Sequence, residues 1–551
     1  MAQHARAGQP CVPEDLIDLH QLREAYHHAD AASIAPVSFG TSGHRGSSLR
    51  GSFQDLHVAA LTQAIVELRA SWAATGPLFV GADSHALSAC ALATLRQVLS
   101  KTDVDARFAI DDVLVPTPVI SNAILQWNRQ HPDQLADGII LTPSHNPPQD
   151  GGFKYNPPSG GPAEPEITDR IAERANALLN DRSQLWERGS DDAAQFQSVD
   201  LIGQYVDSLA DVIDLNAIRD AGLRLAVDPL GGSALAVWQE VKKRHALQVD
   251  ILNETIDPSF GFMHLDHDGV IRMDCSSPFA MAGVVARAKA YDVCIGHDPD
   301  ADRHGIVTAQ GVMNPNHFLS LAVDHLLRTR KAWSASANVG RTVVTSAMID
   351  RVAQAHGRTA FETPVGFKWF VEGMNNGSLV FGGEESAGAS FVDQQGRPWS
   401  TDKDGIIMGL LAAEIIATQK QSLDALWEKL TEQHGQVFYG RDDQHASHAV
   451  RARIKSLQPD QISVTTLANK PITRILSRAR GNDASIGGLR LETADGWIAM
   501  RPSGTEDILK VYAESFVSEA HVQTLLQDAQ NIVRSVTQDD ASTPTTTPTA
   551  S

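Results

Sequence analysis

The sequence is poor in cysteine, in basic charge and in long apolar runs. Its four cysteines are far apart and form no C-x-x-C pair, which is typical of incidental thiols in a reducing compartment. The 46 basic residues against 66 acidic ones leave a net charge of −20, which argues against nucleic acid or an anionic membrane as a partner. The longest apolar run, residues 406–417, is interrupted by Glu414 and is too short to span a bilayer. The first residues lack the apolar core of a signal peptide, so by elimination we expect a cytoplasmic protein.

The composition is that of ordinary globular domains, with 42% hydrophobic and 20% charged residues. At about 150 residues for each domain, the chain should hold about three to five of them. Alternating strand and helix patterns predict α/β domains with mixed, largely parallel sheets over 1–205, 206–318 and 319–444. A smaller α+β domain with β-rich segments is expected over 445–551, and it ends in a Thr- and Pro-rich tail that we expect to be disordered.

The first candidate site follows a short apolar run at 139–141. This run predicts a buried strand that ends at Thr142-Pro143, because proline cannot donate to a sheet ladder. The next side chains are those of Ser144 and His145, within a loop rich in proline and glycine. Ligands of parallel sheets bind beyond the carboxyl ends of the strands, so Ser144 is well placed for chemistry. The alternative is a surface turn with a capping serine.

A second candidate site follows the predicted strand 292–296. Asp298, Asp300 and Asp302 alternate in a short loop and can converge on one hard divalent cation, such as Mg²⁺. The alternatives are an Asp-rich turn or half of an EF-hand loop, although no Glu occupies the twelfth position. Arg303 and His304 follow directly and are suited to meet the charge of a phosphate group.

Two further loops carry polar groups on glycine-rich frames. Glu384 and Ser386 follow a predicted strand and suit hydrogen bonding to neighbouring sugar hydroxyls, although a solvated acidic turn is the alternative. The second loop offers a guanidinium, two hydroxyls and a glycine, which are Arg501, Ser503, Thr505 and Gly504. Such a set can form an anion site for a phosphate monoester.

Together, in this order, the four loops resemble those of the α-D-phosphohexomutase superfamily. Two sequence motifs are similar to those of the bacterial-type, glucose-specific phosphoglucomutase branch. They are Gly-Glu-Glu-Ser-Ala-Gly at 383–388 and Asp-Pro-Asp-Ala-Asp-Arg-His-Gly at 298–305. The resemblance covers about residues 1–535. It implies four domains around a central cleft, with one loop from each domain.

The resemblance also implies roles for individual residues. Ser144 would carry the transferable phosphoryl group, and its phosphoserine oxygen would bind one Mg²⁺ per subunit together with Asp298, Asp300 and Asp302. The residues implied around the phosphoryl group are Arg45, His145, Lys154 and Arg303, with Lys154 as the proton shuttle. Those implied for the sugar hydroxyls are Glu384 and Ser386, and those for the distal phosphate are Lys368 and the loop at 501–505. The sequence departs from many relatives at Asp83-Ser84-His85, where Asp-Thr-Arg is usual, so no catalytic role is assigned there.

The implied reaction is the reversible interconversion of α-D-glucose 1-phosphate and glucose 6-phosphate. Glucose 1,6-bisphosphate would be both intermediate and activator, hexose phosphates would be the partners, and the protein would be a monomer or homodimer. A Mg²⁺-dependent phosphatase is the nearest alternative, but it would not need a second phosphate loop. A non-catalytic sugar-phosphate sensor is the other, and it would be expected to have lost Ser144 or one of the aspartates.

Overall fold

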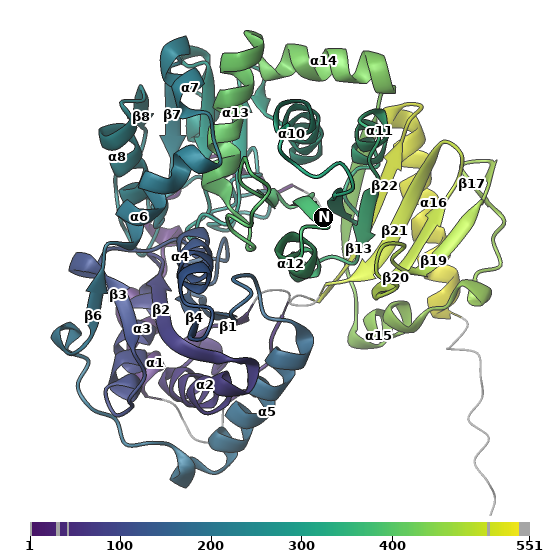
Figure 1. Ribbon diagram of the computed structural model, residues 1–551. Coiled ribbons are helices and arrows are strands. Elements are labelled where there is room, and N and C mark those ends of the chain that lie inside the picture. Colours follow the sequence, from purple (N-terminus) through teal and green to yellow (C-terminus); the bar gives the residue numbers. More distant parts are fainter. Residues whose placement is uncertain (1–2, 29–33, 41–42, 504–506, 539–551) are drawn as a thin grey trace, which may run out of the picture.

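The computed structural model describes residues 3–28, 34–40, 43–503 and 507–538 (Figure 1). Its four main sheets lie within residues 44–199, 225–312, 338–391 and 438–515. The expected domain boundaries stay predictions, and the fourth sheet begins at Phe438, before the boundary expected at 445. The tail expected to be disordered lies, from residue 539 onward, outside the described residues.

The first sheet has the order β1-β5-β4-β2-β3-β6. Its strands are β1 (His44–Gly46), β2 (Ala74–Ala82), β3 (Ala106–Ala109), β4 (Leu135–Leu141), β5 (Gly151–Asn156) and β6 (Gln197–Val199). The helices of this part are α1 (Leu19–His27), α2 (Asp55–Leu68), α3 (Ala86–Leu99), α4 (Thr117–Gln130) and α5 (Pro165–Asn180). β4, β2, β3 and β6 run parallel, whereas β5 and β1 are antiparallel to their neighbours.

The second sheet has the order β11-β10-β9-β7-β8. Its strands are β7 (Leu225–Asp228), β8 (Val249–Ile251), β9 (Val293–Gly296), β10 (Gly305–Thr308) and β11 (Gly311–Val312). The helices are α6 (Leu201–Ser208), α7 (Leu215–Ala221), α8 (Ala234–His245) and α9 (Ala282–Val285). β8, β7 and β9 are parallel, and β10 returns antiparallel to β9.

The third sheet has the order β13-β12-β14-β15. Its strands are β12 (Asn338–Thr342), β13 (Ala360–Thr363), β14 (Leu379–Glu384) and β15 (Gly388–Phe391). The helices are α10 (Pro315–Thr329), α11 (Met348–Ala355), α12 (Lys368–Asn375), α13 (Gly405–Gln419) and α14 (Leu423–His434). β13, β12 and β14 are parallel, and β15 is antiparallel to β14.

The fourth sheet is antiparallel, with the order β16-β22-β21-β20-β19. Its strands are β16 (Phe438–His445), β19 (Arg474–Arg478), β20 (Ser485–Glu492), β21 (Gly496–Pro502) and β22 (Ile508–Ser515). A small ladder joins β17 (Thr466–Leu467) to β18 (Lys470–Pro471), and the helices are α15 (His448–Ser456) and α16 (Glu519–Gln538). The predicted fold class, three similar α/β domains followed by an α+β domain, is therefore confirmed.

The candidate loops of the first three sheets occupy the same topological position. In each of the first three, a parallel strand is followed by an antiparallel neighbour, in the pairs β4–β5, β9–β10 and β14–β15. The connections of these pairs are residues 142–150, 297–304 and 385–387, which carry Ser144, the three aspartates and Ser386. In the fourth sheet, the connection from β21 to β22 follows Arg501. This repeated position is the arrangement that duplication of one α/β unit would produce.

Helix α13 forms the apolar centre between the second and third sheets. Asp404 caps it by accepting hydrogen bonds from the backbone N–H groups of Ile406 and Ile407. Residues 405–417 are all buried, as expected of a helix that is apolar on every side. The single charged residue in this stretch, Glu414, is paired with Arg330 and His325. No helix in the described residues is long and apolar enough to cross a membrane.

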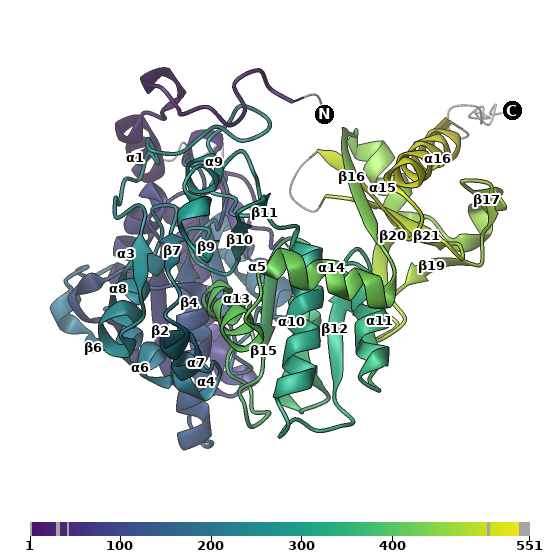
Figure 2. The same ribbon diagram turned by 90° about the horizontal axis from the view of Figure 1, so that it is seen from above.

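The fourth domain is attached to the third, with the first two domains on the other side of the third (Figure 2). An apolar cluster joins Val343 and Val344 to Trp497 and Tyr512 across this contact. Beside it, the carboxylate of Glu362 accepts two hydrogen bonds, of 2.7 and 3.0 Å, from the guanidinium of Arg480 in the fourth domain. Packing and paired charge therefore both hold the two domains together.

One segment differs from what its sequence indicates. The apolar residues 113–115, directly before Pro116, are typical of a strand, but they lie outside any ladder, and Val115 N–H donates to Ala82 O. Residues 152–156, which follow the serine loop, belong to β5. Its antiparallel pairing with β4 places Lys154 opposite Ile140.

Candidate active site

Ser144 lies just past the carboxyl end of β4. Its backbone has a left-handed φ of 59°, which is uncommon for a residue with a side chain. Its buried hydroxyl donates a hydrogen bond of 2.6 Å to Asp298 Oδ2. The start of β5 passes very close to this loop, because a Cβ on Gly152 would lie 2.1 Å from the carbonyl oxygen of Thr142. Glycine at position 152 therefore allows the loop to pack directly against β5.

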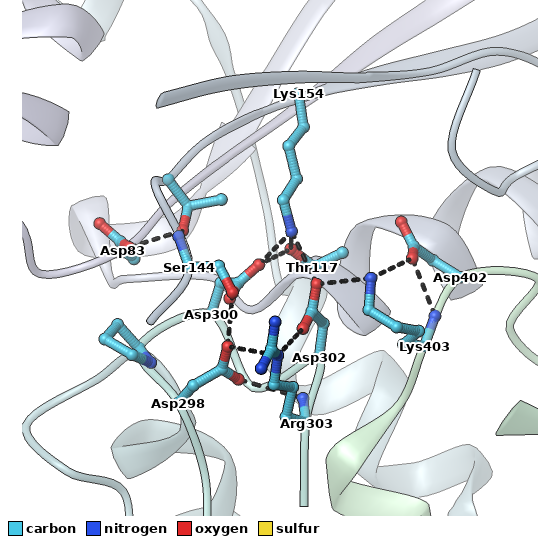
Figure 3. Close-up of polar contacts among 12 residues, drawn as sticks. Asp83, Thr117, Ser144, Lys154, Asp298, Asp300, Asp302, Arg303, Asp402 and Lys403 are labelled. Carbon is cyan, nitrogen blue, oxygen red and sulfur yellow. Dashed lines mark hydrogen bonds and ion pairs between the residues drawn. The ribbon is translucent and has the colours of Figure 1, made fainter. Parts of the chain in front are cut away.

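Asp298, Asp300 and Asp302 converge in the connection between β9 and β10 (Figure 3). One carboxylate oxygen from each lies within 4.8 Å of the others, and all three side chains are buried. Burial raises the pKa of Asp298, and the charges of Asp300 and Asp302 raise it further. Among the described residues, Asp300 Oδ1 and Asp302 Oδ1 have no hydrogen-bond partner. A buried set of carboxylates whose oxygens are still free to accept fits a hard divalent cation such as Mg²⁺.

Two lysines from different domains meet this carboxylate cluster. Lys154 Nζ, on β5, lies 2.5 Å from Asp300 and 2.8 Å from Asp302. Lys403 Nζ, just before α13, lies 3.0 Å from Asp302. Burial would raise the pKa of Asp302, but these two ammonium groups outweigh it and hold that pKa well below its usual range. Burial likewise opposes the charge of Lys154, but Asp300 and Asp302 raise its pKa, so Lys154 is an ammonium ion here.

Three other predicted residues surround the same cluster. Arg45, on β1, donates a hydrogen bond of 3.1 Å to Asn146 Oδ1 in the serine loop. The guanidinium of Arg303 lies 3.9 Å from the carboxylate of Asp298. Burial lowers the pKa of His145, and the charges of Arg303 and Arg45 lower it further, so the imidazole is neutral. The structure therefore brings Arg45, His145 and Arg303 to the serine and aspartate loops.

The predicted sugar loop is joined to the aspartate loop by backbone contacts. Glu384 ends β14, and its Oε1 accepts a hydrogen bond of 2.9 Å from Gly366 N–H. Burial raises the pKa of Glu384 to about 7. Ser386 follows and is partly exposed. His304 N–H donates to Ala387 O at 3.1 Å, which connects the second and third domains at this point.

Within the described residues, His304 and Lys368 make no hydrogen bond or ion pair with the three aspartates. The ring of His304 is buried against Phe318, and burial lowers its pKa to about 3, so it is neutral. Lys368 begins α12 and lines a narrow cavity together with Lys154 and Asp402. Lys368 thus shares a cavity with Lys154, which contacts the aspartates, whereas the ring of His304 packs against Phe318.

The predicted phosphate loop belongs to the fourth domain. Arg501 lies on β21, and Ser503 follows that strand, with its N–H donating to Ile508 O at 2.8 Å. Gly504 and Thr505 lie outside the described residues.

The sequence analysis missed Thr117 and Lys403, and both contact the aspartates. Thr117 Oγ1 donates a hydrogen bond of 2.5 Å to Asp300 Oδ2, and its N–H donates to Asp300 O at 2.9 Å. The Pro-Thr-Pro at the start of α4 was visible, but nothing in the sequence indicates its partner. Lys403 lies in a charged trio, 402–404, directly before the apolar run of α13. That change of composition was the available signal.

Comparison with known proteins agrees with this arrangement. The four domain models described as phosphoglucomutase/phosphomannomutase domains I, II, III and the C-terminal domain match residues 36–182, 203–311, 314–434 and 462–532. A phosphoglucomutase of Komagataeibacter xylinus is 48% identical over 535 residues, which cover 96% of each chain.

Two solved structures have the same fold. The pp63/parafusin phosphoglucomutase of Paramecium, in an open form, has a TM-score of 0.70 at 20% identity, and the match covers 94% of this chain and 98% of that one. A phosphoglucomutase/phosphomannomutase family protein of Burkholderia thailandensis has a TM-score of 0.68 at 20% identity, covering 90% and 97%. With four matching domains and a near full-length relative, the chain belongs to the phosphoglucomutase/phosphomannomutase family of the α-D-phosphohexomutase superfamily.

Proposed function

We propose that this protein is a phosphoglucomutase, which reversibly interconverts α-D-glucose 1-phosphate and D-glucose 6-phosphate. The observation that carries the proposal is the hydrogen bond between Ser144 Oγ and Asp298. It places a nucleophilic hydroxyl beside a buried carboxylate cluster, which is an arrangement suited to phosphoryl transfer. The 48% identity to a phosphoglucomutase supports glucose as the sugar.

In this proposal Asp298, Asp300 and Asp302 hold one Mg²⁺ ion, with the phosphoserine oxygen of Ser144 as a further ligand. Asp300 Oδ1 and Asp302 Oδ1, which accept no hydrogen bond from the described residues, support the assignment. When bound, the cation neutralises negative charge on the oxygens of the transferring phosphoryl group.

The reaction begins with Ser144 phosphorylated. The bond between phosphorus and Ser144 Oγ breaks, and a bond forms to the free 6-hydroxyl of glucose 1-phosphate, which loses its proton. We assign Lys154 as the proton carrier between these two oxygens. Its ammonium must first leave Asp300 and Asp302, and it then gives a proton to the leaving Ser144 Oγ. The resulting neutral amine takes the proton of the 6-hydroxyl, so Lys154 ends the step as an ammonium ion again. The residues assigned to the surroundings of the phosphoryl group are Arg45, His145 and Arg303. His304 was also expected to meet phosphate charge, but its neutral ring is buried against Phe318, so we assign it no contact with the phosphoryl group.

The product of the first transfer is glucose 1,6-bisphosphate, which turns end for end before its other phosphoryl group returns to Ser144. The phosphate that is not reacting must therefore be held in either orientation of the sugar. We assign this task to Lys368 and to the loop of the fourth domain, with residues Arg501, Ser503, Gly504 and Thr505. Glu384 and Ser386 bind the sugar hydroxyls. Exclusion of water from the closed site protects the phosphoserine from hydrolysis.

The experiment that tests the proposal also tests the alternative of a Mg²⁺-dependent phosphatase. Purified protein is given glucose 1-phosphate, Mg²⁺ and a trace of glucose 1,6-bisphosphate, and both glucose 6-phosphate and inorganic phosphate are measured. A mutase forms glucose 6-phosphate without net release of phosphate. Steady release of phosphate without glucose 6-phosphate would overturn the proposal.

A further inference from the structure

The backbone of the proposed phosphoserine is strained. Ser144 has a φ of 59° and follows a proline. A side-chain-bearing residue keeps this left-handed conformation only when its surroundings hold it. The contacts of the loop at 142–146 therefore decide where Ser144 Oγ points.

One set of contacts holds the loop on the N-terminal side of Ser144. Thr142 Oγ1 accepts a hydrogen bond of 2.8 Å from Ser144 N–H and donates one of 2.6 Å to Asp83 Oδ2. Asp83, just after β2, also accepts from Ser88 Oγ at 2.6 Å and from His85 N–H at 3.0 Å. Its buried carboxylate is thus fully supplied with donors.

A second contact holds the loop on the C-terminal side of Ser144. His85 Nε2 lies 3.0 Å from Asn146 O, and His85 Nδ1 lies 2.8 Å from Asp83 Oδ2. Both partners are acceptors, so both ring nitrogens must carry a hydrogen, and the ring is an imidazolium. The carboxylate of Asp83 compensates this buried charge, and the ring of Phe260 packs against it, with centroids 4.9 Å apart. Burial opposes the charge, but Asp83 outweighs it and raises the pKa of His85.

We propose that His85, supported by Asp83, is a positioning residue that holds the phosphoserine loop in its reactive conformation. The inference rests on the proposed function of Ser144 and adds a residue whose ring is bonded to Asp83 and Asn146. Asp83 reaches the loop through Thr142, and His85 reaches it directly through Asn146 O. The strained Ser144 is therefore held from both sides by neighbouring residues of one segment.

Two substitutions separate the two contacts of the imidazole. In His85→Gln, the amide nitrogen takes the place of Nε2 and can still donate to Asn146 O. In His85→Asn, the amide nitrogen takes the place of Nδ1, so the contact to Asp83 remains and the contact to the loop is lost. We expect His85→Asn to lower kcat by about 10- to 100-fold, because small displacements of reacting groups have effects of this size. KM should change less than about threefold, and His85→Gln should keep a markedly higher kcat than His85→Asn.

A matched control is available in the same domain. His57 is also buried, its Nε2 lies 2.8 Å from Ala35 O, and its Nδ1 accepts from Gln54 N–H at 3.1 Å. Among the described residues, its hydrogen bonds and its ring contact go to Ala35, Gln54 and His44, which lie outside the serine loop. His57→Asn and His57→Gln should lower thermal stability to a similar extent while leaving kcat and the phosphorylation of Ser144 unchanged.

A second route avoids His85 altogether, in case His85→Asn does not fold. Thr142→Val keeps the shape of the side chain but removes its hydrogen bonds to Asp83 and Ser144, whereas Thr142→Ser keeps them. We expect Thr142→Val to slow single-turnover transfer from the phosphoenzyme to glucose 1-phosphate by about tenfold or more, and Thr142→Ser to restore it.

The outcomes distinguish this inference from the proposed function. If the wild type carries no phosphate on Ser144 and forms no glucose 6-phosphate, the proposed function fails. Two outcomes with an active wild-type phosphoenzyme would overturn the positioning role while the proposed function stands. In one, His85→Asn transfers phosphate at the wild-type rate. In the other, His85→Asn and His85→Gln transfer it at the same rate.

Discussion

The hydroxyl of Ser144 donates a hydrogen bond of 2.6 Å to Asp298, although the two residues are 154 positions apart and lie on loops of different domains. The contact joins the proposed phosphoryl carrier to the proposed metal ligands. Both loops follow a buried parallel strand and precede an antiparallel one. The site is thus built from equivalent positions of two domains that pack with their strand ends together.

Replacing Ser144 by alanine should remove the phosphoryl acceptor and lower turnover by about 1,000-fold or more. Ser144→Gly is the matched variant, because glycine adopts the left-handed φ of 59° without strain. We expect both variants to be inactive and the glycine variant to be at least as stable as the alanine variant. Mass spectrometry should locate phosphate on Ser144 in the active wild type. Phosphate on a different residue would refute the assignment.

Asp300→Asn removes one charge from the proposed metal site. The Mg²⁺ concentration needed for half-maximal activity should rise at least about tenfold, because a neutral amide binds a hard cation less well than a carboxylate. The increase in melting temperature that Mg²⁺ gives the wild type should also be lost, which is a readout independent of activity. Asp268→Asn is the control, in the separate group of Asp266, His267 and Asp268. It should leave the Mg²⁺ dependence of both activity and melting temperature unchanged. Identical Mg²⁺ titrations of wild type and Asp300→Asn would reduce the three aspartates to an acidic turn.

Arg501→Ala removes a guanidinium that we assign to the phosphate that is not reacting. Loss of a charge-assisted contact of this kind costs about 1.5–3 kcal/mol, or roughly 10- to 100-fold in binding. The KM for glucose 1-phosphate should rise, and activity should depend more strongly on added glucose 1,6-bisphosphate, because the intermediate escapes before it turns. Arg474→Ala, at an exposed residue paired with Glu492 in the same domain, should behave as the wild type. Unchanged dependence on the bisphosphate in Arg501→Ala would contradict the two-phosphate mechanism.

Glu414→Gln should destabilise the protein in a pH-dependent way. Glu414 accepts hydrogen bonds from His325 Nε2 at 2.9 Å and from Arg330 at 2.7 and 2.8 Å. Burial would raise the pKa of Glu414, but His325 and Arg330 outweigh it and lower the pKa from 4.5 to about 2. A carboxyl group with a lowered folded-state pKa stabilises the fold above pH 4.5, and this contribution is lost as the pH falls from 4.5 toward 2.

The free energy of unfolding of Glu414→Gln should therefore be about 3 kcal/mol lower than that of the wild type at neutral pH. The difference in melting temperature between wild type and Glu414→Gln should shrink as the pH is lowered from 5 to 3, which calorimetry measures. Glu432→Gln, at an exposed position of α14, is the control and should show little change at any pH. A difference that grows on acidification would show that Glu414 does not carry this ion pair.

The loops of the candidate site could be found from the sequence because each is continuous. The three alternating aspartates, the serine after Thr142-Pro143 and the acidic loop at 384–386 all stand next to a strand and between glycines or prolines. Charge, hydroxyl chemistry and backbone restriction are properties of neighbouring residues, so they can be recognised without the fold. The expectation of a strand at 113–115 failed for the opposite reason, since a strand needs a partner that local sequence does not specify.

The sequence by itself determined the α/β pattern, the acidic charge balance and the identity of the reactive groups. Only the tertiary structure decided which groups meet. Lys154 reaches Asp300 across 146 residues, Lys403 reaches Asp302 from the start of a buried helix, and His85 reaches Asn146 O from a neighbouring loop. None of these pairs has a spacing that could be recognised in the chain. They form because apolar burial around α13 and the sheets fixes the domains against one another, and that burial depends on total packing and not on any local pattern.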